Sequence, residues 1–211
     1  MENIYGQYKE RVEGVMDDLL YKLNGYNNDI INAGGDPVFD HISARIKSDR
    51  SMREKLARLG LAVTPEMALS ENVHDAVGVR IVTCFIDDIF ENIKQIRALK
   101  GVTVLEEKDY LTNAKPNGYR SDHLIISIEE PFEDAAGATP GMWYAEIQLR
   151  TIAMDSWAVL EHRLKYKKQI SDTALIVAEL KRVADELASC DVSMQTIRDM
   201  IKEIKHEDSA C

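Results

Sequence analysis

The sequence predicts an α+β fold, in which a mixed central β-sheet of about five strands is flanked by helices. Segments rich in β-branched residues gather between residues 77 and 149. Apolar residues with the three-to-four spacing of amphipathic helices occupy both ends of the chain. We therefore expect a core over residues 40–168, between an N-terminal helical arm (1–39) and a C-terminal helix (169–211).

The first third of the chain is expected to be mainly helical. Apolar residues recur every three or four positions over residues 8–24, which predicts a helix that ends at Gly25. A second helix is expected over residues 40–59, with Gly60 just past its end. Pro65 begins a short third helix.

The middle of the chain alternates between strand and helix signals. The run VGVRIVTCFI, residues 77–86, has the β-branched content of a strand inside a sheet. The segment 115–122 contains Pro116-Asn117-Gly118, which predicts a turn-bearing loop. The remaining strands are expected at residues 102–105, 124–128 and 142–149, and the remaining helices at 87–99, 153–166 and 172–205.

Composition favours a protein of the cytoplasm. The chain has 211 residues, 45% of them hydrophobic, as in an ordinary protein with a packed core. Its most apolar run, residues 77–86, contains Arg80 and is too short to cross a bilayer. The first residues lack the basic and apolar pattern of a secretion signal. Three cysteines without metal-type spacing fit a reducing compartment.

The charge distribution argues against a general nucleic-acid coat protein. The net charge is −10, whereas non-specific binding to nucleic acid needs a basic surface. One strip is nevertheless cationic, and its members are Arg45, Lys47, Arg50, Arg53, Lys55 and Arg58. Such a strip indicates a small anionic ligand, although from charge alone a solvated helix face is the better interpretation.

A polar row is expected on the segment AEIQLRT, residues 145–151. Side chains alternate along a strand, so Glu146, Gln148 and Arg150 should point to one side and the apolar residues to the core. Burying an acid, an amide and a guanidinium is costly without partners, which favours a site. The competing interpretation is an amphipathic strand with one wet face, and for this segment alone we prefer it.

Three further segments carry functional chemistry. Asp75, at the start of a strand and close to Gly78, suits Mg²⁺, which takes one or two carboxylates plus substrate phosphates. In the 115–123 loop, an exposed Tyr119 would stack on a base, beside Lys115 and Arg120 for phosphates. Residues 44–55 offer guanidinium, ammonium and hydroxyl groups to phosphate oxygens. The alternatives are a turn cap, a surface hairpin loop and a solvated helix, each of which is the commoner case.

In this order, the segments resemble the RelA/SpoT-type (p)ppGpp synthetases, and within them the small single-domain alarmone synthetases. The resemblance covers residues 40–168, and six blocks with fixed internal spacing carry it. The blocks are R-x-K-x3-S-x3-K (45–55), D-x-x-G-x-R-I (75–81), K-D-Y (108–110), K-P-N-G-Y-R-S-x-H (115–123), E-I-Q-L-R-T (146–151) and W-A-x-x-E-H-x-x-x-Y-K (157–167).

The resemblance implies a nucleotidyltransferase-like synthetase fold and a GTP diphosphokinase, which moves the β,γ-pyrophosphate of ATP to the 3′-hydroxyl of GDP or GTP. Asp75 and Glu146 would be the catalytic carboxylates and would hold Mg²⁺, with Glu146 as general base. The residues implied for ATP are Arg45, Lys47, Ser51, Lys55 and Arg80. Those implied for GDP or GTP are Lys108, Lys115, Asn117, Tyr119, His123, Gln148 and Arg150.

The resemblance has further implications. It implies synthesis without alarmone hydrolysis, since the chain has little room for a hydrolase domain, and it implies a homotetramer. Regulation by single-stranded RNA or by an alarmone, and the preference among GDP, GTP and GMP, stay open. Asp122 departs from the aromatic or apolar residue that family members often carry there, and it would repel phosphate if it faced the cleft.

Three rival interpretations remain. A toxin-like relative that pyrophosphorylates the tRNA 3′ end would share the ATP side but need a basic tRNA-binding surface. A non-catalytic nucleotide-binding regulator would be favoured by the loss of Asp75 or Glu146, and both are present. A structural helical adaptor would not explain the polar blocks on strands.

Overall fold

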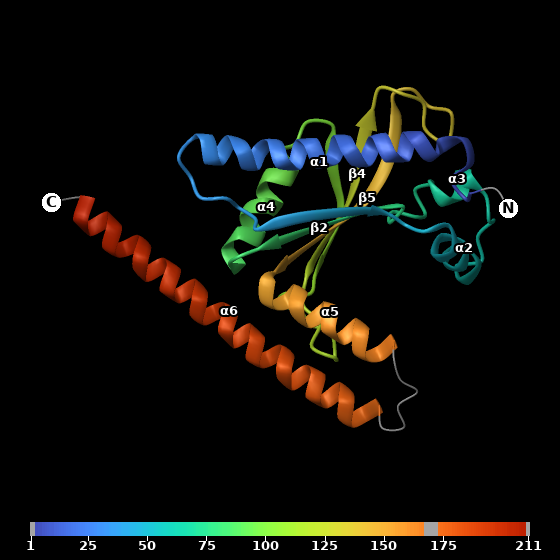
Figure 1. Cartoon of the computed structure of the whole chain (residues 1–211). Helices are drawn as coiled ribbons and strands as arrows, with labels where there is room; N and C mark the ends of the chain where they lie inside the picture. Colours follow the sequence, from blue (N-terminus) through green and yellow to red (C-terminus); the bar gives the residue numbers. More distant parts are fainter. Residues whose placement is uncertain (1–2, 167–172, 210–211) are drawn as a thin grey trace.

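A five-stranded mixed sheet forms the centre of the protein. The computed structural model describes residues 3–166 and 173–209 (Figure 1). The strand order is β1-β2-β5-β4-β3, with β2 and β5 parallel and the other pairs antiparallel. The strands are β1 (His41–Ile46), β2 (Val77–Thr83), β3 (Val102–Asp109), β4 (Asp122–Glu130) and β5 (Gly141–Thr151). The expected α+β class with a mixed sheet is confirmed.

Helices lie on both sides of this sheet. In Figure 1, α1 lies along one side of the sheet, and α5 and the long α6 lie on the other. The helical elements are η1 (Gly6–Tyr8), α1 (Lys9–Asn32), α2 (Asp49–Arg58), α3 (Pro65–Ala68), α4 (Ile86–Ala98), α5 (Ile152–Tyr166) and α6 (Thr173–Ser209). Among the described residues, no helix has both the length and the apolar character that crossing a bilayer requires.

The two faces of the sheet differ because side chains alternate along each strand. Val79, Ile81, Leu124 and Ile147 point to one face and are almost fully buried. They share one apolar cluster with buried residues of α1 and α4, which therefore cover this face. The alternate positions carry polar side chains on the opposite face, where α5 and α6 leave part of the sheet uncovered.

The expected helix over residues 40–59 is wrong in its first half. Residues 41–46 form the edge strand β1, and only residues 49–58 are helical. Ile42 and Ile46 are four residues apart, which fits a helix face, but with Ala44 they also fit the alternation of a strand. Pairing with β2 decides between the two patterns, and Ser48 then caps the helix by accepting from the backbone N–H of Ser51 at 3.3 Å.

The first helix does not end at Gly25 as expected. It continues to Asn32 because its packing continues: Tyr26 and Asn27 are buried. Asn27 Oδ1 accepts from the backbone N–H of Val38 at 3.0 Å, and the hydroxyl of Tyr26 bonds to Asn92 of α4. Tertiary contacts thus outweigh the helix cost of a glycine, about 1 kcal/mol. Lys167 and the expected boundary at 168/169 lie outside the described residues.

Candidate active site

The uncovered face of the sheet carries the predicted polar row. Glu146, Gln148 and Arg150 alternate with buried apolar residues along β5, as expected. In the sheet register, Gln148 lies between Arg80 of β2 and His123 of β4. Residues from three segments far apart in the sequence therefore meet on one surface.

Glu146 is held by a histidine. His123 Nδ1 lies 2.8 Å from Glu146 Oε1, and His123 Nε2 lies 2.7 Å from the hydroxyl of Tyr119. One neutral tautomer satisfies both contacts, with Nδ1–H donating to the carboxylate and Nε2 accepting from the tyrosine. The hydrogen bond from His123 lowers the pKa of Glu146 despite burial of the carboxyl. Glu146 is therefore an ionised base at neutral pH.

Asp75 is paired with two lysines. Its carboxylate oxygens lie 3.0 Å from Lys47 Nζ and 2.7 Å from Lys55 Nζ. Burial would raise the pKa of Asp75, but the hydrogen bonds and charges of Lys55 and Lys47 outweigh burial and lower it. The charge of Asp75 in turn raises the pKa of Glu146, although less than His123 lowers it. The two carboxylates therefore lie close enough to act on one another electrostatically.

Arg80 and Arg150 share one carboxylate that the sequence analysis missed. The Nη1 atoms of both guanidiniums lie 3.2 Å from Asp155 Oδ1. Asp155 is in the first turn of α5, and its side chain is only 16% exposed. The sequence does contain a sign of this role, because Asp155 follows Arg150 by five residues and lies at the start of the helix that comes directly after β5.

A hollow of about 240 Å³ opens beside these arginines. It lies along β1 and β2, next to Gln148 of β5. Its wall contains the flat guanidinium groups of two predicted ATP residues, Arg45 and Arg80, which suit stacking on a ring. Its lining residues are Ser43, Ala44, Arg45, Gly78, Val79, Arg80 and Gln148.

The loop Lys115–Ser121 lies at the β4 side of the site. We call it the acceptor loop, after the nucleotide that the family resemblance predicts there. The ammonium of Lys115 lies 4.8 Å from the ring centre of Tyr119. Asn117 Nδ2 donates to Glu161 of α5 at 3.1 Å, a second partner that sequence reasoning did not assign. The expected exposed Tyr119 is wrong: it is half-buried, and its hydroxyl accepts from Arg150 Nη2 at 2.6 Å. A neighbouring helix covers the ring, which the sequence of the loop does not reveal.

Two predicted residues have partners at the margin of this network. Ser51 accepts from the hydroxyl of Ser48 at 3.0 Å, within the first turn of α2. Lys108 lies in register with His123, but its ammonium is 3.2 Å from Glu106 on the same strand. Among the described residues, neither Ser51 nor Lys108 pairs with Asp75 or Glu146.

Asp122 does not face the site. It neighbours His123 in β4, so its side chain points to the opposite, helix-covered face, where Asp122 is 1% exposed. Burial, and then the charges of Glu107 and Asp109, raise the pKa of Asp122 to about 7. The concern that Asp122 repels phosphate in the cleft is therefore removed.

Known proteins share this sequence and fold. A model of the region found in RelA / SpoT proteins matches residues 44–171. The chain is 40% identical over 159 residues to the GTP pyrophosphokinase YwaC of Bacillus subtilis, covering 72% of this chain and 73% of that protein. It is 30% identical over 196 residues to the GTP pyrophosphokinase YjbM of the same organism, covering 93% and 87%.

A solved structure extends the comparison to three dimensions. The structure of small alarmone synthetase 1 from Bacillus subtilis, bound to its product pppGpp, superposes with a TM-score of 0.77. Its sequence is 27% identical, and the match covers 90% of this chain and 94% of that one.

Proposed function

Because the chain belongs to the RelA/SpoT family, we propose that it is a GTP pyrophosphokinase of the small alarmone synthetase type. It transfers the β,γ-pyrophosphate of ATP to the 3′-hydroxyl of GDP or GTP, which gives AMP and ppGpp or pppGpp. The observation that carries the proposal is the meeting of two ionised carboxylates, Asp75 and Glu146, with lysines, arginines and a histidine on one face of the sheet. The pppGpp held by the related synthetase is the product that this reaction predicts.

In the proposed reaction, Glu146 is the general base. It takes the proton of the 3′-hydroxyl as the oxygen attacks the β-phosphorus of ATP. A bond forms between that oxygen and phosphorus, the bond from phosphorus to the α,β-bridging oxygen breaks, and AMP leaves. His123 orients the carboxylate and helps to keep it ionised. Phosphoryl transfer of this kind depends mainly on positioning and on cations around the phosphates.

The donor nucleotide is assigned to the β1 and β2 side of the site. We assign the adenine to the hollow between Arg45 and Arg80, where guanidinium planes can stack on it. Lys47, Lys55 and the hydroxyl of Ser51 are assigned to the phosphates. Both lysines now pair with Asp75, so binding of ATP requires them to exchange a carboxylate for phosphate oxygens.

The acceptor nucleotide is assigned to the β4 side, where Tyr119 stacks on guanine. The residues assigned to its positioning are Lys108, Lys115, Asn117, His123, Gln148 and Arg150.

Asp75 and Glu146 fit a Mg²⁺ ion. Two nearby carboxylates beside the phosphate-binding lysines are the kind of oxygen set that Mg²⁺ completes with substrate phosphates. When bound, the ion would neutralise charge on the transferring pyrophosphate. The ionised state of both carboxylates near pH 7 supports this assignment.

Three finer predictions accompany the proposal. The enzyme works in the cytoplasm, synthesises without hydrolysing, and assembles as a homotetramer. An apolar groove of about 580 Å³ between α5 and α6 supports assembly. Control by single-stranded RNA or by an alarmone remains a prediction from the family resemblance.

The test is a direct assay. Purified protein is incubated with Mg²⁺, labelled ATP and GDP or GTP, and AMP and a 3′-pyrophosphorylated guanosine nucleotide are sought. A Glu146→Gln variant should lose turnover by at least about a hundredfold, the size of a general-base contribution, while ATP binding persists. A parallel reaction offers a tRNA transcript instead. Product from tRNA alone, or equal activity of Glu146→Gln, would overturn the proposal.

A further inference from the structure

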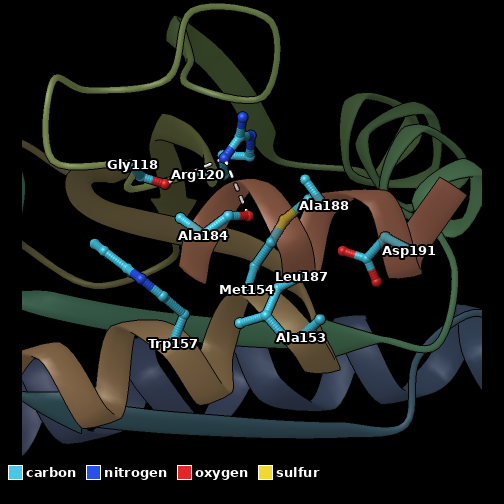
Figure 2. A pocket seen from close by; sticks show the side chains of 9 residues that line it. All are labelled: Gly118, Arg120, Ala153, Met154, Trp157, Ala184, Leu187, Ala188 and Asp191. Carbon is cyan, nitrogen blue, oxygen red and sulfur yellow. Dashed lines mark hydrogen bonds between the residues drawn. The ribbon is translucent and has the colours of Figure 1, made fainter. Parts of the chain in front are cut away.

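The helix α6 touches the acceptor loop at its glycine. Gly118 has φ +92, and a Cβ placed there would lie 2.5 Å from Ala184 Cβ and 3.0 Å from Lys181 Cα. Figure 2 shows Gly118 beside this turn of α6. No residue with a side chain fits without moving the loop or the helix, so the backbone of the loop and α6 are in direct contact.

Arg120 ties the same loop to the same turn. Its Nη2 lies 3.0 Å from Asp185 Oδ1, and its Nη1 lies 3.4 Å from the backbone oxygens of Gly118 and Ala184 (Figure 2). Arg120 was expected to contact phosphates, but its guanidinium is directed to α6. It thus bridges the loop and α6.

Tyr119, between these two residues, packs against the same helix. Its ring joins the small cluster of Trp157, Leu180 and Ala184. The indole Nε1 of Trp157 donates to the backbone oxygen of Leu180 at 2.9 Å, which fixes α5 against α6. Three consecutive loop residues therefore contact one short stretch of α6.

We propose that residues 180–185 of α6 form the seat of the acceptor loop, and that this seat sets the affinity for the guanosine nucleotide. The inference rests on the proposed function, because it takes Tyr119 as the guanine contact. The seat holds Tyr119 against His123 and Arg150, in the arrangement that links the loop to Glu146. Arg120 is then a positioning residue, which acts through α6.

The seat can be altered without undocking the helix. α6 has other anchors on the core: Asp191 accepts from Thr151 Oγ1 at 2.7 Å, and Gln195 donates to Asp87 at 2.9 Å. The predicted ATP residues lie on β1, β2, α2 and the short connection from β1 to α2. A change in the seat should therefore weaken binding of the acceptor and spare ATP.

The test separates the Michaelis constants of the two substrates. Ala184→Leu crowds the seat and should raise KM for GDP by about tenfold or more, the usual size of overpacking effects. Asp185→Asn breaks the partly exposed ion pair and should raise it by about two- to fivefold. Both variants should keep KM for ATP within about twofold of wild type, the limit of a near-neutral change.

Two variants on α6 serve as matched controls. Ala178→Leu makes the same change at an exposed position, and Glu186→Gln removes the neighbouring acid, which pairs with Arg182 on the same helix. Neither should alter KM for GDP. The proposed role of the seat would be wrong if Ala184→Leu and Asp185→Asn changed KM for GDP and KM for ATP equally, or changed neither.

Two further measurements isolate Arg120 and the loop. If Arg120 acts through α6, Arg120→Ala and Arg120→Ala/Asp185→Asn should have the same KM for GDP. If the increases in KM caused by the two single changes add up in the double variant, Arg120 would instead contact a phosphate of the nucleotide. Hydrogen exchange of acceptor-loop amides needs no substrate and should quicken in Ala184→Leu; unchanged exchange there would also count against the seat. An inactive wild-type protein would defeat the proposed function, and the exchange measurement would still test the seat.

Discussion

Asp155 is the residue whose change should affect both halves of the site. Asp155→Asn keeps the shape but removes the charge that Arg80 and Arg150 share. Hydrogen bonds to charged groups contribute about 1.5–3 kcal/mol, so kcat/KM should fall by about ten- to a hundredfold, for ATP and for GDP alike. Steady-state kinetics with each nucleotide varied in turn would show this. Glu54→Gln removes an exposed acid that pairs with Arg50, and it should behave as wild type; a similar result for Asp155→Asn would remove Asp155 from the site.

Asp122 should make the protein less stable as pH rises. Its folded-state pKa of about 7 lies above the ordinary value of 3.8, so the folded protein holds this proton more tightly than the unfolded chain. The contribution of Asp122 to stability is therefore complete below about pH 4 and is lost as the pH rises to about 7. Its Oδ1 is buried without a hydrogen-bond partner among the described residues, which is why ionisation is costly.

Asp122→Asn tests this reasoning. The amide cannot ionise, so the variant should exceed wild type in unfolding free energy at pH 8, by about 1–3 kcal/mol, and approach it near pH 4. Urea unfolding across this range measures the difference. Burial raises the pKa of Glu130 to about 6, so Glu130 also makes the unfolding free energy depend on pH. This contribution is the same in both proteins and cancels in the comparison. A difference that does not change with pH would contradict the prediction.

At the scale of elements, the sequence predicts most of the helices and strands, because each has its own periodicity. The segment 40–59 shows the limit of this reasoning. Ile42, Ala44 and Ile46 fit two patterns, and the choice depends on pairing with β2, more than thirty residues away. The expectation that Tyr119 is exposed fails for a similar reason, since the helix that covers its ring lies more than sixty residues later in the chain.

An ion pair helps to anchor the second half of α6, beside the hydrogen bond from Gln195 to Asp87. Arg198 Nη1 lies 2.5 Å from Asp88 of α4, whose side chain is 7% exposed, and its guanidinium lies 4.4 Å from the ring centre of Phe85. Arg198→Met leaves a buried carboxylate without this partner and should cost about 1.5–3 kcal/mol. Hydrogen exchange should quicken in α6 after Asp191 and stay unchanged in β5.

The control for this prediction lies on the same helix. Within the described part of the chain, Arg182 pairs only along α6, with Glu179 and Glu186, on an exposed face. Arg182→Met should therefore change neither the melting temperature nor the exchange pattern appreciably. Equal effects of the two variants would show that Arg198 does not anchor α6.

Across the protein, sequence blocks that are far apart in the chain meet because β5 pairs with β2 on one side and with β4 on the other. The pairing with β2 places Arg80 beside Gln148, although more than sixty residues separate them. The sequence supplies the chemical groups and their order, which were sufficient to predict the class of site. It does not reveal which groups bond to one another, because ion pairs such as Asp155 with two arginines arise only when the strands and α5 are assembled.

The same assembly leaves apolar surface uncovered, and this surface is the basis for the last prediction. Leu160 and Leu164 of α5 are each 57% exposed and line the groove between α5 and α6. Exposed apolar surface of this kind marks contacts between proteins, and copies of one chain join most often through symmetric faces. A Leu160→Glu/Leu164→Glu variant should therefore have a smaller mass by light scattering than the wild-type oligomer, which we expect to be a tetramer. Leu105→Glu, at a 50% exposed position on the edge strand β3, should keep the wild-type mass. A monomeric wild-type protein, or a double variant of unchanged mass, would show that this groove does not join copies of the chain.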